Sequence, residues 1–177
     1  MLKRLLFTFL TVMVLYSAIL VAYRLNEPEK EELVSELNDE ALPYSSLEDY
    51  TLNSGTSSHH FYFVCSPQDN DCIYMETTVL KTVENHTGLK MADILEYVDI
   101  TDSIRKLDTT HMMEQWHITG YPAFIACHVE DNQIVVDNTI VSTVQYPLSA
   151  ENVESWLMQN GLYVTATAVP LDTAIPE

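Results

Sequence analysis

The sequence is poor in glycine, cysteine and basic side chains, and each scarcity excludes something. Only four of the 177 residues are glycine, and none forms a glycine-rich phosphate loop. Three cysteines are too few for a disulfide scaffold, and their odd number leaves at least one unpaired within a monomer. Eight Lys and Arg stand against 26 Asp and Glu, which gives a formal net charge of −18. Such an acidic surface repels nucleic acid and anionic lipid headgroups, so we expect no nucleic acid partner. We interpret the acidity as solubilising, with recruitment of a basic partner as the alternative.

A long uncharged run lies near the N-terminus. Residues 5–23 carry no formal charge, follow Lys3 and Arg4, and precede Arg24. As a helix this run would extend over roughly 28 Å, close to the hydrocarbon thickness of a bilayer. We therefore expect residues 1–25 to be a single-pass anchor in the cell membrane, with the N-terminus inside and the C-terminal domain extracytoplasmic. A cleaved secretory signal is the alternative, and it would leave the domain on the same side.

The rest of the chain divides into three parts by composition. Residues 26–57 are polar and acidic, which predicts a stalk with at most a short helix near Leu33. Residues 58–162 alternate between strand and helix patterns and form the predicted domain. Residues 163–177 are predicted to be a loose tail.

Local patterns predict the elements of this domain. An aromatic and β-branched run indicates a buried strand at 60–65, and apolar residues at helical spacing indicate a helix from Cys72 to about His86, ended by Gly88. Because strands and helices alternate, we expect an α/β fold whose first two strands pair in parallel. The further expected elements are a strand at 94–99, a short helix at 109–116 with Met112, Met113 and Trp116 on one side, strands at 123–129 and 134–141 joined at Asp131-Asn132, and a last helix at 150–159 with Val153, Trp156 and Leu157 facing inward.

Three segments together resemble the thioredoxin superfamily. They are the strand-turn-helix at 61–76, the segment 116–124 around Tyr121-Pro122, and the last helix at 148–157. The resemblance implies a thioredoxin-like fold, in which a central mixed sheet is flanked by helices and a cis Pro122 faces the redox centre. Membrane-anchored relatives of this kind occur in Gram-positive bacteria, which agrees with the expected topology.

The resemblance also implies a degenerate active site. Oxidoreductases of the family carry Cys-x-x-Cys where the first helix begins, because free N–H groups there favour a thiolate. The matching residues here are Asp69-Asn70-Asp71-Cys72, so Asp69 stands in place of the attacking cysteine and Cys72 remains as the resolving one. A carboxylate can cap the helix, but it cannot exchange disulfides.

Cys65 leaves three interpretations open. It is a small strand hydrophobe, a partner of Cys72 in a structural disulfide, or one half of a widened redox pair. A bridge would require Cα atoms within about 4.4–6.8 Å of one another, which the sequence does not decide. Cys127, in the middle of a predicted strand, is expected to be a buried and inert thiol.

We expect no metal and no cofactor. Asp69, Asp71 and Glu76 are interpreted as helix-capping carboxylates, because a calcium loop needs more oxygens and a supporting glycine. The histidines lack a closed metal-ligand spacing and are assigned to surface or packing roles; they include His59, His60, His111 and His117.

Three functions follow from this reading. The favoured one is a redox-degenerate module that binds an extracytoplasmic peptide or protein through Tyr121, Pro122 and Asp69, because the family's cis-proline backbone pairs with substrate peptides. Tyr121 itself either contacts the peptide or packs. The alternative is an active thiol–disulfide oxidoreductase that uses Cys65 and Cys72. The third is a structural subunit of an envelope or bacteriocin-handling complex, since similar folds occur among bacteriocin transport accessory proteins.

Overall fold

The computed structural model describes residues 9, 13, 14, 16, 17, 41–107 and 109–164. The chain divides into two compact units, Met1–Glu32 and Leu33–Glu177. In the first unit the five described residues are helical. Within the described part of the chain, no helix has the length and apolar character needed to cross a membrane. The rest of the predicted anchor at 5–23, the short helix near Leu33 and nearly all of the predicted tail at 163–177 lie outside the described residues.

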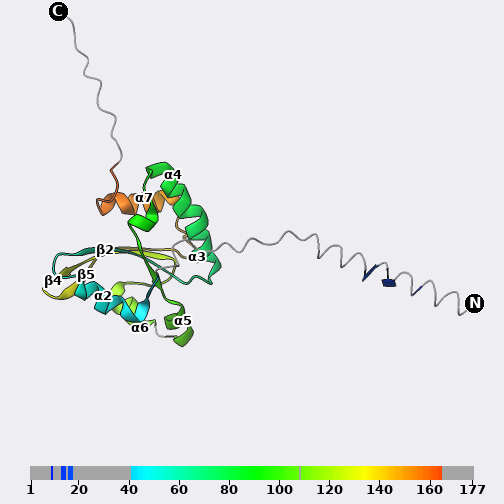
Figure 1. Cartoon of the computed structure of the whole chain (residues 1–177), viewed down its shortest axis with the longest axis horizontal. Coiled ribbons are helices and arrows are strands. Elements are labelled where there is room, and N and C mark those ends of the chain that lie inside the picture. The colour runs from blue at the N-terminus through cyan, green and yellow to red at the C-terminus, as the bar shows by residue number, and fades with distance from the viewer. Residues whose placement is uncertain (1–8, 10–12, 15, 18–40, 108, 165–177) are drawn as a thin grey trace, which may run out of the picture. The chain divides into compact units, whose positions relative to one another are not determined.

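A five-stranded mixed sheet in the order β1-β3-β2-β4-β5 forms the centre of the second unit (Figure 1). β3 runs parallel to both β1 and β2, whereas β4 runs antiparallel to β2 and β5. The predicted parallel pairing of the first two strands, 60–65 with 94–99, is therefore confirmed. The strands are β1 (Leu42–Pro43), β2 (His59–Cys65), β3 (Glu96–Asp99), β4 (Ala123–Glu130) and β5 (Gln133–Val141).

Helices cover both faces of this sheet (Figure 1). One face carries α3 (Asn70–Tyr74), the π-helical segment η3 (Met75–Leu80), α4 (Lys81–Thr87) and α7 (Ala150–Gln159). The other face carries α2 (Leu47–Asn53), α5 (Thr101–Lys106) and α6 (Thr110–Trp116). The domain also contains two short 3-10 helices, η2 (Tyr44–Ser46) and η4 (Met91–Asp93). The arrangement is the predicted α/β architecture, a mixed sheet flanked by helices that resembles the thioredoxin fold.

Each face of the sheet buries its own core, because successive side chains along a strand point to opposite faces. In β2, Phe63 and Cys65 pack in the core that contains α3, α4 and α7 residues, while Tyr62 and Val64 pack in the other. Each core contains one buried tryptophan, Trp156 in the first and Trp116 in the second. The three residues of the last helix that were expected to face inward, Val153, Trp156 and Leu157, are all buried.

The folded domain begins earlier than predicted. β1 and α2 lie within residues 26–57, which the composition had indicated as a stalk. Leu42 pairs with Val98 in the sheet, and Leu47 is fully buried in the second core. The start expected at residue 58 is therefore too late. β1 has only two residues and α2 is short with few apolar side chains. Neither therefore produces a hydrophobic pattern that can be recognised among the acidic residues around it.

Two helices differ from the sequence prediction. Met113 of α6 is 51% exposed, although it was expected on the same side of the helix as Met112 and Trp116, which are buried. Met112 and Trp116 are four positions apart and share the buried face, whereas Met113 is turned about 100° from Met112 around the helix. α5 was not predicted. None of its residues is buried, so its sequence lacks the apolar pattern from which a helix could have been predicted.

The predicted helix stop and hairpin turn are confirmed. Gly88 ends α4 with a φ of 73°, in the left-handed region that glycine adopts readily. Asp131 and Asn132 join β4 to β5 with φ values of 49° and 60°. Positive φ at both central residues is the geometry that a two-residue hairpin loop requires.

Candidate functional site

The candidate site begins where α3 follows β2. Asp69 is the N-cap of α3 and has an extended backbone. Its Oδ1 accepts hydrogen bonds from the backbone N–H of Asp71 at 2.9 Å and of Cys72 at 3.2 Å. The predicted capping role of Asp69 is confirmed. Asp69 therefore supplies a carboxylate whose hydrogen bonds stabilise the start of α3.

Cys65 and Cys72 form a disulfide, with their Cα atoms 5.8 Å apart. The interpretation of Cys65 as an unpaired strand hydrophobe is therefore wrong. Strand alternation turns Cys65 toward α3, where both cysteines are fully buried in the first core. The backbone N–H of Ser66 donates a hydrogen bond to Sγ of Cys72 at 3.2 Å. In this conformation the bond is shielded from a thiol in solution.

The Tyr121–Pro122 peptide bond is cis, as the resemblance implied. Val64 of β2 pairs with Ala123 of β4, so Cys65 and Pro122 come next at the same end of these two strands. Pro122 is buried, whereas Tyr121 is half-buried and packs against both cores. Tyr121 thus has a packing role, and part of the residue is still accessible. The structure gathers the cis proline, the disulfide and the Asp69 cap at one end of the sheet.

Cys127 is a free and buried cysteine, as predicted. Burial, followed by the nearby carboxylates of Asp137 and Glu96, raises the pKa of its thiol to about 12. The thiol therefore stays protonated near neutral pH, and a protonated thiol is a poor nucleophile.

The interpretation of Glu76 as a capping carboxylate is wrong. Glu76 is buried in the π-helical segment, four residues after Cys72. The pKa of Tyr97 is raised, mainly by burial and then by the charge of Glu76. A carboxyl group therefore lies in the same core as the disulfide, which the sequence pattern did not indicate.

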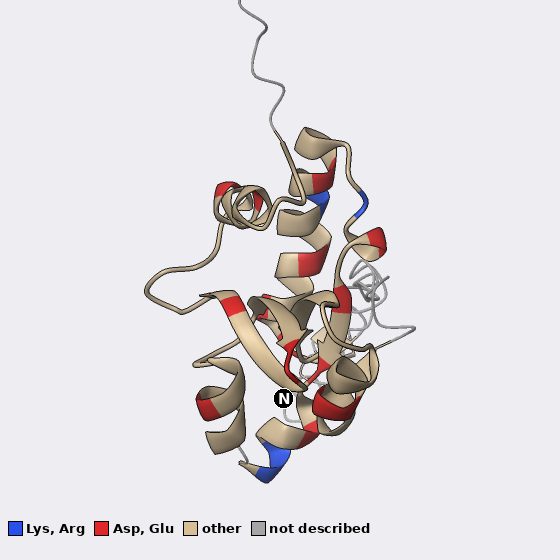
Figure 2. Ribbon diagram, turned by 90° about the vertical axis from the view of Figure 1, so that its left-hand side faces the viewer, with Lys and Arg blue, Asp and Glu red and all other residues tan. Residues whose placement is uncertain are grey.

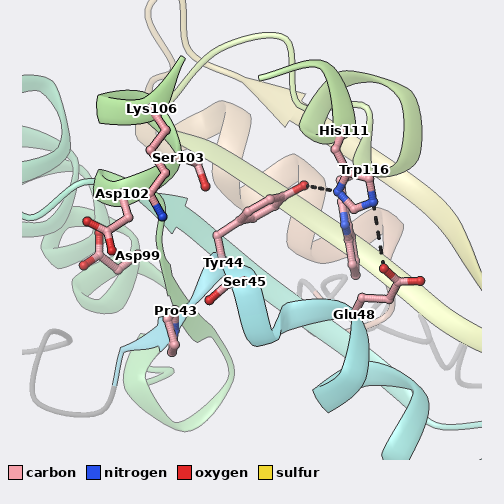
Figure 3. A pocket seen from close by; sticks show the side chains of 10 residues that line it. All are labelled: Pro43, Tyr44, Ser45, Glu48, Asp99, Asp102, Ser103, Lys106, His111 and Trp116. Atoms are coloured by element: carbon pink, nitrogen blue, oxygen red, sulfur yellow. Dashed lines mark hydrogen bonds and ion pairs between the residues drawn. The ribbon is translucent and has the colours of Figure 1, made fainter. Parts of the chain in front are cut away.

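A cleft on the opposite face of the sheet was not predicted (Figure 3). In it the Tyr44 hydroxyl and Nδ1 of His111 are 2.9 Å apart, and Nε2 of His111 lies 3.8 Å from Oε2 of Glu48. The cleft has a volume of about 290 Å³ and includes none of the predicted site residues. Its lining residues come from distant parts of the chain, so no local signal could have identified them; they are Pro43, Tyr44, Ser45, Glu48, Asp99, Asp102, Ser103, Lys106, His111 and Trp116.

Acidic side chains are distributed over helices and strands of the described domain (Figure 2). Some of them lie at the end of the sheet that carries the disulfide, where Asp99 of β3 pairs with Cys65 and Asp71 follows the Asp69 cap.

Comparison with known proteins finds likeness in fold only. No protein-family model matches the chain, and no curated protein matches it significantly in sequence. A thioredoxin of Plasmodium falciparum is 16% identical over 68% of this chain and 88% of that chain, with a TM-score of 0.40. A thioredoxin of Trichomonas vaginalis is 11% identical over 69% of this chain and 98% of that chain, with a TM-score of 0.41.

A redox protein from Chlamydomonas reinhardtii is 15% identical over 76% of this chain, with a TM-score of 0.42, and the match covers 39% of that longer chain. Likenesses at this level say nothing about activity. The domain itself resembles the thioredoxin fold in its sheet. The strands lie side by side in the order β1-β3-β2-β4-β5, and only β4 runs antiparallel to β2.

Proposed function

We propose that this protein is a membrane-tethered, extracytoplasmic thioredoxin-like module that binds a peptide or protein partner and does not exchange disulfides. The observation that carries the proposal is the combination at the start of α3. A carboxylate, Asp69, caps the helix where the attacking sulfur belongs, and the remaining Cys72 is buried in a disulfide with Cys65. Thiol exchange needs an accessible thiolate, and neither feature supplies one.

The binding surface in this proposal lies beside the cis Tyr121–Pro122 bond. Tyr121 packs against both cores and is still partly exposed, so it offers a rigid aromatic contact at low cost in side-chain entropy. Asp69 lies at the start of α3, at the same end of the sheet as Pro122. Extended peptides that dock next to a sheet use main-chain hydrogen bonds for affinity and side-chain pockets for specificity.

An insulin-reduction assay tests the absence of exchange. The full-length protein in detergent micelles should not accelerate reduction of insulin by dithiothreitol above the uncatalysed rate, while a thioredoxin run in parallel does. Turnover by the wild-type protein that disappears in Cys72→Ser would overturn the proposal.

An NMR titration tests binding. The oxidised insulin B chain is the probe, because it is an unfolded peptide without free thiols. We expect shift changes confined to residues 66–72 and 119–123, and weaker binding in Tyr121→Ala. Tyr50→Ala is the matched control, because Tyr50 is 44% exposed and contacts His60 at the other end of β2. Equal loss in both variants, or no shifts at all, would argue against this surface.

The membrane tether is tested separately. We expect the full-length protein to stay in the membrane pellet after alkaline carbonate extraction, and the domain to be digested by protease added outside spheroplasts. Release by carbonate with a processed N-terminus would instead identify residues 1–25 as a cleaved signal, and an undigested domain would contradict the extracytoplasmic location.

The second candidate is an active thiol–disulfide oxidoreductase. It is favoured by the hydrogen bond from the Ser66 backbone N–H to Sγ of Cys72, because such a donor would stabilise a Cys72 thiolate after reduction. Alkylation and mass spectrometry across envelope redox potentials discriminate the two. A pair that stays disulfide-bonded throughout that range, or two thiols that stay free throughout it, would eliminate the oxidoreductase.

A further inference from the structure

Two histidines lie opposite one another at the end of the sheet farthest from the disulfide. His59 of β2 pairs in register with His128 of β4. Their imidazole rings have centroids 5.5 Å apart and an interplanar angle of 35°. β2 runs from His59 to Cys65, so roughly 20 Å of strand separates this pair from the disulfide.

Asp137 of β5 is the third residue of this group. Both of its carboxylate oxygens lie 2.9 Å from Nδ1 of His128. The register explains the placement: Ala126 pairs with Asn138 and Cys127 with Val136, so Asp137 is the extra residue of a β-bulge. A bulge redirects one side chain out of the regular alternation, and here it directs a carboxylate toward His128.

The donor atoms of the three residues suit a metal ion. One ligand atom from each of His59, His128 and Asp137 lies within 4.8 Å of the other two. Zn²⁺ with ligands at about 2.0–2.2 Å in tetrahedral geometry separates them by roughly 3.3–3.5 Å. Rotation of these three part-exposed side chains can bring their ligand atoms from within 4.8 Å to this shorter separation. Imidazole nitrogen with carboxylate oxygen is a donor set for zinc and its neighbours, and a poor one for Mg²⁺ or Ca²⁺.

The surrounding charge favours a cation. A second carboxylate, Oε2 of Glu130, lies 3.9 Å from Nε2 of His128. None of the strands β2, β4 and β5 contains a lysine or arginine. Positive charge on these strands is therefore limited to protonated histidine.

We propose that His59, His128 and Asp137 bind a divalent transition-metal ion of the zinc type at the outer end of β2, β4 and β5. Three protein ligands leave a fourth position, which water would fill. This site is independent of the proposed peptide-binding function, because it lies at the opposite end of the sheet.

Isothermal titration of the full-length, untagged protein with ZnCl₂ tests the site. The hydrogen bond with Asp137 raises the pKa of His128, so a proton competes with the metal, and the titration is run at pH 8. We expect one Zn²⁺ per chain, and at least about tenfold weaker binding in each of His59→Ala, His128→Ala and Asp137→Asn. Mg²⁺ should not compete.

His86→Ala is the matched control. His86 is an exposed histidine that also pairs with a carboxylate, Oε1 of Glu154 at 2.7 Å, but it lies on α4. Its substitution should leave zinc affinity unchanged. Absence of saturable binding, or equal affinity in His59→Ala and His86→Ala, would overturn the proposal. His59 is exposed, so its variant folds and decides the matter even if His128→Ala is unstable.

Discussion

The carboxylate of Asp69 accepts a hydrogen bond from the backbone N–H of Cys72 at 3.2 Å. This bond stabilises the start of α3. The same turn brings Sγ of Cys72 under the N–H of Ser66 and into a buried disulfide with Cys65. Asp69, Cys65 and Cys72 thus each have a structural role at the junction of β2 and α3.

Removal of the cap should destabilise the domain. We expect Asp69→Ala to lower the free energy of unfolding by about 1 kcal/mol, because two backbone N–H groups lose their acceptor. Asp69→Asn should retain most of the stability, since asparagine is an equally good N-cap. Urea denaturation measures both. Equal losses in the two variants would show that the charge, and not the cap, matters.

Restoring a sulfur should create activity. In the double variant Asp69→Cys with Cys65→Ala, a new thiol at the helix start can pair with Cys72 three residues later, and the helix end lowers its pKa. We expect insulin reduction above the wild-type rate. The matched control is Asp69→Ser with Cys65→Ala. If the folded cysteine variant is as inactive as this control, the missing sulfur is not what makes the site inert.

The disulfide should contribute about 2–3 kcal/mol to stability in the chain-entropy model, because Cys65 and Cys72 are only seven positions apart. We expect dithiothreitol to lower the urea midpoint of the wild-type protein by a corresponding amount. The double variant Cys65→Ser with Cys72→Ser should start lower and not respond to reductant, while Cys127→Ala should respond as the wild type does. A reductant-insensitive wild type would contradict this expectation.

Cys127 should be almost unreactive in the native protein. Its pKa is raised from 9.0 to about 12, mainly by burial, so the thiolate fraction at pH 8 falls about a thousandfold. The shift favours the neutral thiol, and the stability it provides is present below pH 9 and lost as the pH rises toward 12. Alkylation by iodoacetamide at pH 8, in native buffer and in guanidinium, measures the difference. Similar rates would contradict burial of the thiol.

A buried hydrogen bond should couple α2 to the sheet. Oγ1 of Thr51 donates to the Leu47 carbonyl oxygen at 2.6 Å, so it accepts from the Tyr62 hydroxyl at 2.9 Å. We expect Thr51→Val and Tyr62→Phe each to cost about 1–2 kcal/mol, and the double variant less than their sum. Tyr97→Phe is the control, because the described residues offer the Tyr97 hydroxyl no hydrogen-bond partner. Additive losses would show that α2 is not coupled through this bond.

The elements with local signals could be predicted from the amino-acid sequence alone. The aromatic run of β2, the Asp131-Asn132 hairpin and the cap at Asp69 each depend on neighbours within a few residues. Helical spacing likewise identified α7 and its buried Trp156. Such features form because the backbone and adjacent side chains satisfy one another, so their pattern is visible in the chain itself.

Contacts between residues far apart in the sequence became visible in the folded domain alone. Leu47, which the composition placed in a stalk, is part of the core because it packs in the same cluster as Tyr62 and Trp116. Cys65 forms a disulfide with Cys72 because strand alternation and the start of α3 direct the two sulfur atoms toward each other. The approach of His128 and Asp137 depends on a bulge in the pairing of β4 with β5. Each of these is set by strand register, which is a relation between segments that neither segment specifies alone.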